Sequence, residues 1–113
     1  MVGFYSIGES GKGFDDERVT SSFFRLEKEI HGGNFDVYEF CKANNGNIFI
    51  EHHEEIAGEG KRILGYIHKT TKLGKTDVGK EYGNKKYKEL MEEGYIFTGV
   101  YECDVFGYAK RVR

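Results

Sequence analysis

The chain has 113 residues, a mass of 13.0 kDa and a formal net charge of −2, which is the size of one domain. Aromatic residues make up 15% of the sequence, and this content of bulky side chains excludes an intrinsically disordered chain. No apolar run approaches the ~20 residues of a membrane helix, and the first ten residues lack the basic and apolar regions of a secretory signal. We therefore expect a cytoplasmic protein with a single domain over residues 1–113.

The first predicted element is a short apolar strand at residues 2–7, followed by a glycine-rich connection at residues 8–13. The connection has Gly13 after Lys12, where a phosphate-binding P-loop requires Ser or Thr. We predict a flexible link there, with a backbone anion nest as the alternative.

A helix is predicted from Asp15 or Asp16 to Ile30, because either aspartate can cap a helix N-terminus. The apolar residues of this stretch recur at spacings of four, three and four: Val19, Phe23, Leu26 and Ile30. Such spacing is typical of one face of a helix. Gly32 and Gly33 are expected to end it.

A β-hairpin is predicted around residues 44–47, since Asn-Gly is the strongest short hairpin signal, and its strands span residues 35–43 and 47–56. If Asn45 and Gly46 form a two-residue turn, the register follows. The expected pairs are Ala43 with Ile48, Cys41 with Ile50, Glu39 with His52, and Tyr38 with His53. The face expected to point at the core carries Val37, Cys41, Ala43, Ile48 and Ile50.

The remaining residues predict a third strand at 61–71, a long basic loop at 72–84 and a second helix at 85–93, with Asn84 as its cap and Gly94 as its end. A last strand spans residues 95–105, ahead of a basic tail. The expected fold class is α+β: a mostly antiparallel four- to five-stranded sheet with two helices packed on one face.

Charge is unevenly distributed along the chain. Residues 1–60 contain five Lys or Arg and twelve Asp or Glu, whereas residues 61–88 contain nine Lys or Arg and two acidic residues. Lysines attract phosphate, and tyrosines among them can stack on bases. We predict that residues 61–88 hold an anionic ligand, either a nucleic acid or a nucleotide, unless they fold back over the acidic part of the chain. The expected site comprises Lys69, Lys72, Lys75, Lys80, Lys85, Lys86, Tyr66 and His68.

Two other functions stay open. A protein–protein inhibitor or adaptor would use the acidic half, residues 1–60, as a surface that imitates nucleic acid. A small metal-independent nuclease or phosphodiesterase would use His68, or His52 with Glu39 as the carboxylate that orients its imidazole. We favour a non-enzymatic binding protein, because the composition is similar to that of accessory proteins of phages and mobile elements.

No cofactor and no metal are predicted. Glu51, His53 and Glu55 share one face of a strand, and His52 and Glu54 share the other. This set lacks a fourth ligand for zinc, so we interpret it as a solvated strand end.

Cys41 and Cys103 match no metal-ligand spacing and are expected to be thiols in a reducing compartment. Neither a chelator nor a reductant should therefore change the melting temperature. Strand edges without proline, together with complementary charges, predict a homo-oligomer, most simply a dimer, with no membrane partner.

Overall fold

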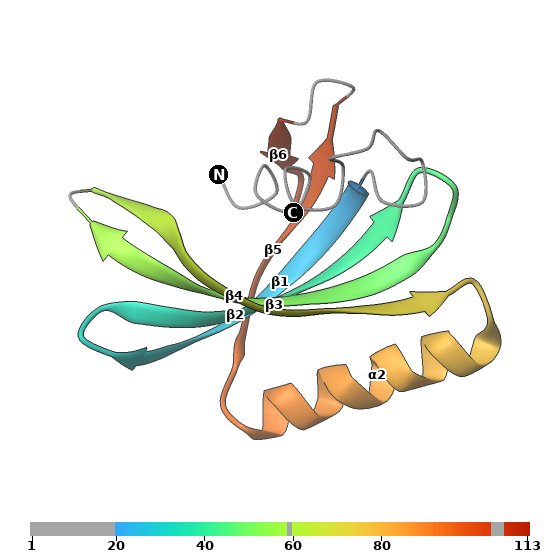
Figure 1. Cartoon of the computed structure of the whole chain (residues 1–113), viewed down its shortest axis with the longest axis horizontal. Coiled ribbons are helices and arrows are strands. Elements are labelled where there is room, and N and C mark those ends of the chain that lie inside the picture. Colours follow the sequence, from blue (N-terminus) through green and yellow to red (C-terminus); the bar gives the residue numbers. More distant parts are fainter. Residues whose placement is uncertain (1–19, 59, 105–107) are drawn as a thin grey trace.

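The computed structural model describes residues 20–58, 60–104 and 108–113. They form an antiparallel sheet with the strand order β4-β3-β2-β1-β5-β6, and α2 runs along one side of this curved sheet (Figure 1). The elements are β1 (Thr20–His31), β2 (Asn34–Ala43), β3 (Ile48–Gly58), β4 (Lys61–Gly74), α2 (Asp77–Glu92), β5 (Ile96–Cys103) and β6 (Ala109–Arg111). The α+β class is confirmed. The expectation of four or five strands and two helices is wrong, since the described residues form six strands and one helix.

The helix predicted to end at Ile30 is the largest error, because residues 20–31 form β1. Residues 15–19 lie outside the described part, as do the strand and the glycine-rich connection predicted at residues 2–13. β1 pairs with β2 on one side and β5 on the other, so it is a central strand. Phe23 and Leu26 are 2% and 0% exposed on opposite faces of the sheet. Their spacing of three results from burial on both faces and not from one side of a helix.

The two glycines after β1 form a turn between strands. Gly32 and Gly33 have φ angles of 57° and 81°, and a two-residue type I′ hairpin turn requires positive φ at both positions. The signal that was expected to end a helix therefore joins β1 to β2.

The predicted hairpin of β2 and β3 is present, but its register differs by one residue. The Gly46 N–H donates to the Ala43 carbonyl and the Ala43 N–H donates to the Asn47 carbonyl, which makes a loop of three residues. Tyr38 consequently lies opposite His52. All four expected pairs are therefore wrong, those of Ala43 with Ile48 and Cys41 with Ile50 as well as those of Glu39 with His52 and Tyr38 with His53. Cys41 shares its face with Phe49, while Ile48 and Ile50 lie on the other face.

The helix α2 begins at Asp77, well before the predicted start at residue 85. Thr76 caps it in place of Asn84, and its side-chain oxygen accepts a hydrogen bond from the Gly79 N–H at 3.2 Å. Gly79 and Gly83 lower the helix propensity of this first half, which explains why the sequence suggested a loop. Gly94, with a φ of 97°, follows the helix end as predicted.

The two faces of the sheet are covered differently. On the helix face, Tyr87 of α2 meets the rings of Phe24 and Phe40 edge-on, and Leu90 is 1% exposed. The other face, called here the opposite face, carries a hydrophobic cluster of Phe23, Cys41, Ala43 and Phe49.

Candidate functional site

A row of aromatic and imidazole rings crosses the helix face. The ring of Tyr38 meets Tyr95 edge-on with centroids 5.4 Å apart and stacks on His52 at 4.0 Å. The His52 ring stacks on His68 at 4.4 Å, and His68 meets Tyr66 edge-on at 4.6 Å. We call Tyr95, Tyr38, His52, His68 and Tyr66 the ring row. Its rings come from three neighbouring strands and from the residue before β5.

A β-bulge in β4 completes the ring row. His52 pairs with Lys69 and His53 pairs with Ile67, so His68 is the extra residue of β4 between these two pairs. The bulge brings His68 against His52 and leaves the exposed Lys69 beside them. Bulges of this kind redirect side chains at functional positions.

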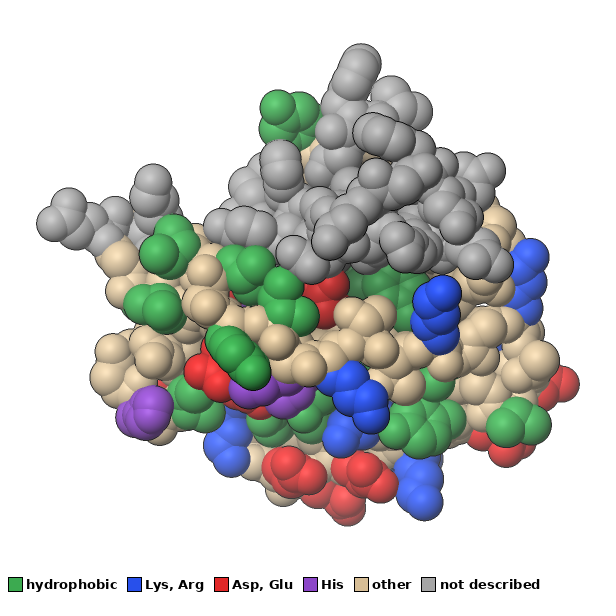
Figure 2. Space-filling model, in the orientation of Figure 1, with side chains coloured by type: hydrophobic (Ala, Val, Ile, Leu, Met, Phe, Trp, Pro, Cys, Tyr) green, Lys and Arg blue, Asp and Glu red, His purple; other side chains and the backbone are tan. Residues whose placement is uncertain are grey.

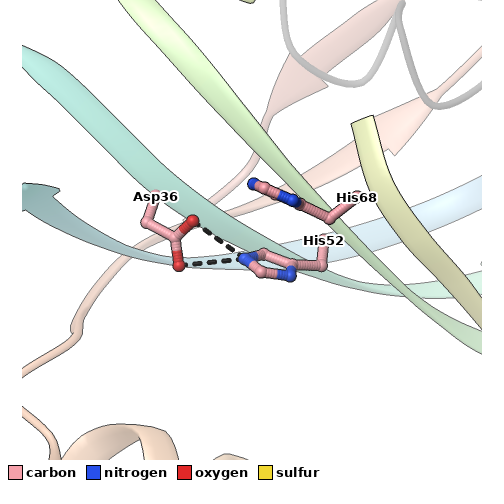
Figure 3. A group of neighbouring side chains, drawn as sticks. All are labelled: Asp36, His52 and His68. Carbon is pink, nitrogen blue, oxygen red and sulfur yellow. Dashed lines mark hydrogen bonds and ion pairs between the residues drawn. The ribbon is translucent and has the colours of Figure 1, made fainter. Parts of the chain in front are cut away.

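Each histidine of the ring row is bound by its own carboxylate. Nε2 of His52 lies 2.8 and 3.0 Å from the two carboxylate oxygens of Asp36 (Figure 3). The Tyr95 hydroxyl donates a further hydrogen bond to Asp36. Nε2 of His68 lies 2.6 Å from Glu54. The carboxylate that orients His52 is therefore Asp36, and not Glu39 as the sequence suggested.

The environment sets the protonation of these groups. Burial lowers the pKa of His52, and the hydrogen bond to Asp36 offsets only part of this effect. Burial and the hydrogen bond to Asp36 raise the pKa of Tyr95 well above its usual value. At neutral pH the Tyr95 phenol is thus a hydrogen-bond donor, and His52 is a neutral ring.

The stacking of the two histidines limits what chemistry they can perform. A neutral imidazole held by a carboxylate suits a general base, but two rings 4.4 Å apart leave no room for a phosphate between a base and an acid. Ligand atoms of Asp36, His52 and His68 lie within 4.8 Å of one another. The ring planes differ by only 23°, so the in-plane lone pairs of the two histidines run nearly parallel and do not converge on one ion.

Four of the eight residues of the predicted anion site lie at the ring row. Tyr66, His68 and Lys69 lie there on β4, and Nζ of Lys86 sits 5.3 Å from the centroid of the Tyr38 ring. Figure 2 shows a histidine side chain beside acidic side chains near the middle of the view, with lysine or arginine side chains close by. Tyr66 is 60% exposed and so available to a ligand.

The other four predicted residues are dispersed. Lys72 lies opposite Phe49 and therefore on the opposite face of the sheet. Lys75 lies in the connection between β4 and α2, and Lys80 and Lys85 are exposed on α2. The eight residues of the predicted site therefore do not form one patch. That they bind an anion stays a prediction.

The opposite face holds a buried ionic cluster that the sequence did not reveal. Nη2 of Arg25 lies 3.0 Å from both Glu27 and Glu55, and Nη1 lies 3.4 Å from Glu39. Arg62 also reaches Glu27 at 2.6 Å. The full buried ionic cluster comprises Arg25, Glu27, Glu39, Glu51, His53, Glu55 and Arg62.

His53 lies between two carboxylates of this cluster. Its Nε2 is 2.8 Å from Glu55 and its Nδ1 is 3.3 Å from Glu51. Burial alone would lower the pKa of His53, but the interactions with Glu51 and Glu55 and the charge of Glu39 outweigh it and raise the pKa to about 9. The imidazole is therefore a cation at neutral pH.

The interpretation of Glu51, His53 and Glu55 as a solvated strand end is wrong, since all three are at most 1% exposed. Ligand atoms of Glu39, His53 and Glu55 lie within 4.8 Å of one another, as in a metal site. A divalent ion there would have to displace the Arg25 guanidinium, which already binds Glu39 and Glu55. The cluster thus carries its own counter-ions.

The two cysteines lie on the opposite face at the hydrophobic cluster. Cys41 is buried, and burial raises the pKa of the partly buried Cys103 to about 11. A thiol with such a pKa is a weak nucleophile at neutral pH.

The chain matches no family model, no curated protein and no solved structure. Within the described ranges, no helix is long and apolar enough to cross a bilayer.

Proposed function

We propose that the protein binds a nucleotide or a single-stranded nucleic acid on the ring row of its helix face, without catalysing a reaction. The observation that carries this proposal is the continuous contact of five rings, which ends at the exposed Tyr66. Flat rings on a sheet surface offer stacking partners to bases of any sequence.

Charge at the ring row supports an anionic ligand. Asp36 and Glu54 are each held by hydrogen-bond donors of the row. By contrast, Lys69 and Lys86 form no ion pair within the described ranges of the chain. Their ammonium groups are thus free of a protein carboxylate and in position to meet phosphates.

The acidic half is a weaker basis for function. Four of its carboxylates, those of Glu27, Glu39, Glu51 and Glu55, belong to the buried ionic cluster and contribute little to the surface. Asp36 is bound to His52 and Tyr95. An inhibitor that imitates nucleic acid needs its carboxylates exposed.

The proposal is tested with fluorescein-labelled single-stranded RNA and DNA of ten nucleotides, read by fluorescence anisotropy over a series of salt concentrations. The double variant Lys69→Glu, Lys86→Glu should weaken binding and make the slope of log affinity against log salt less steep by about 1.4, since each phosphate on a single strand contributes about −0.7. Tyr66→Leu should lose ~1–3 kcal/mol of binding free energy if a base stacks there.

The matched control is the double variant Lys72→Glu, Lys88→Glu. It makes the same change of charge on the same strand and the same helix. Lys72 lies on the opposite face, and the exposed Lys88, two residues after Lys86, projects from another side of the helix. Equal weakening by the two double variants would refute a site at the ring row. A mononucleotide that competes as well as the ten-nucleotide strand would identify a nucleotide as the ligand.

A further inference from the structure

A cavity of about 550 Å³ lies between the sheet and α2, and Phe23, Cys41 and Phe49 of the hydrophobic cluster also border it. Its walls are mainly apolar and aromatic: Phe24, Phe40, Ile50, Leu73, Tyr87 and Phe97. No residue of the ring row is among the described residues that line it. Its volume and its apolar lining are those of a small-molecule site.

The charged side chains among the described lining residues are all cationic. They are Lys42 of β2, Lys80 of α2 and Arg113, and none of the described lining residues is Asp or Glu. All three are exposed, so their charges lie on the solvent side of the apolar walls. The backbone oxygen of Arg113 accepts hydrogen bonds from the Val100 N–H at 3.0 Å and from Nε of Arg111 at 3.3 Å.

We propose that this cavity binds a small amphipathic carboxylate. The apolar body lies against the apolar side chains that line the cavity, and the carboxylate meets the ammonium groups of Lys42 and Lys80. A phosphate headgroup is less well suited, because the lining residues of α2 lie within the helix and present no loop of backbone amides. The site is independent of the nucleic-acid site proposed above.

Decanoate is the probe, and its binding is measured by isothermal titration calorimetry. The double variant Lys42→Gln, Lys80→Gln should weaken decanoate binding at least tenfold, because it removes two charges that face the carboxylate. The control variant Lys72→Gln, Lys88→Gln makes the same change of charge outside the cavity and should leave the affinity unchanged. Decyltrimethylammonium, with the same chain and the opposite charge, should not bind measurably.

Filling the cavity gives a second test. Gly83 lines the cavity from α2, and a Cβ built on it would meet only Cδ1 of Leu73 at 3.5 Å, which is an ordinary contact. Gly83→Leu should therefore fold, with a cooperative thermal transition, and lose decanoate binding. Its affinity for labelled RNA should not change, so a failure here is distinguishable from a failure of the nucleic-acid site.

Three outcomes would overturn the proposal. The first is undiminished decanoate binding by both the Gly83→Leu and the Lys42→Gln, Lys80→Gln variants. The second is equal affinity for decanoate and decyltrimethylammonium. The third is binding of decyl phosphate at least tenfold tighter than that of decanoate, which would show that the cavity prefers a phosphate headgroup to a carboxylate.

Discussion

His52 and His53 are neighbours on β3, yet they belong to different chemical environments. His52 stacks between Tyr38 and His68 on the helix face, where burial lowers its pKa. His53 lies between Glu51 and Glu55 on the opposite face, where these carboxylates raise its pKa to about 9. One residue along a strand thus separates a neutral ring from a buried cation. The face of the sheet, and not the residue type, decides what each histidine does.

The contrast extends to the whole of each face. The opposite face buries the guanidinium of Arg25 against the carboxylates of Glu39 and Glu55, and the carboxylate of Glu51 against His53. Such burial is expensive unless the charges are paired. On the helix face His52 and Lys86 are partly exposed and Lys69 is exposed to solvent. We therefore expect substitutions on the opposite face to change stability most, whereas the binding that we propose concerns the helix face.

The largest expected effect is that of Arg25→Met. This change leaves the buried carboxylates of Glu39 and Glu55 without their guanidinium, so the free energy of unfolding should fall by about 3–5 kcal/mol. Urea denaturation at pH 7 measures it. Arg62→Met is the control. Because the Arg62 side chain is 34% exposed, this variant should lose less of the free energy of unfolding than Arg25→Met. Equal losses in both variants would mean that the cluster does not depend on its buried guanidinium.

The second prediction concerns the pH dependence of stability. The folded-state pKa of His53 is about 9 and its ordinary value is 6.5. Between these values the folded state binds more protons than the unfolded state, so raising the pH is destabilising. By linkage, His53 contributes about 3 kcal/mol to the free energy of unfolding. This contribution should be complete below pH 6.5 and lost as the pH rises through 9. Urea denaturation from pH 6 to 10 should show this loss.

The variant His53→Gln is the control for that pH series. Its stability should be lower than that of the original chain at pH 6 and should vary little between pH 6.5 and 9. An unchanged alkaline slope in this variant would show that another group titrates there.

The third prediction tests how closely α2 approaches β4. A Cβ at Gly79 would lie 2.1 Å from the carbonyl oxygen of Leu73, whereas one at Gly83 makes only an ordinary contact. The free energy of unfolding of Gly79→Ala should therefore fall by about 2 kcal/mol, because the added methyl group overpacks the contact between α2 and β4. The free energy of unfolding of Gly83→Ala should rise by up to ~1 kcal/mol, because alanine has a higher helix propensity than glycine. Thermal unfolding compares the two, and an equal response would contradict the close approach at Gly79.

The smallest expected effect belongs to His52. Because its folded-state pKa is lowered, the unfolded state binds more protons near pH 6, and stability should fall as the pH drops below 6.5. His52→Gln should flatten this acidic limb and leave the alkaline limb unchanged, which is the reverse of the expected behaviour of His53→Gln. A pH series of melting temperatures for both variants decides whether the two faces titrate separately.

Local signals in the sequence identified several elements correctly. The Asn-Gly pair placed the hairpin of β2 and β3, and Gly94 marked the end of α2, because these residues favour particular backbone angles whatever surrounds them. Tyr66, His68, Lys69 and Lys86 were singled out by charge and ring content alone. Their partners in the ring row, Tyr38 and Tyr95, were not, since only strand pairing brings them there.

The buried ionic cluster was predictable only with the correct register. One face of β3 carries every second residue of the strand: Phe49, Glu51, His53 and Glu55. The polar residues of this face thus come directly after its apolar Phe49. This alternation was visible in the sequence, but the assumed two-residue turn shifted the pairing with β2 by one residue. That shift put Ile48 and Ile50 on the expected core face, so the face with Glu51, His53 and Glu55 was interpreted as solvated.

The sequence by itself determined the α+β class, the Asn-Gly hairpin and the contrast between an acidic and a basic stretch, because composition and turn preferences act locally. Tertiary structure decided that residues 20–31 form a strand and that charges are buried on one face. Both follow from pairing with residues distant in the chain. A central strand takes its burial from its neighbours, and a buried charge persists only where a partner from another strand meets it.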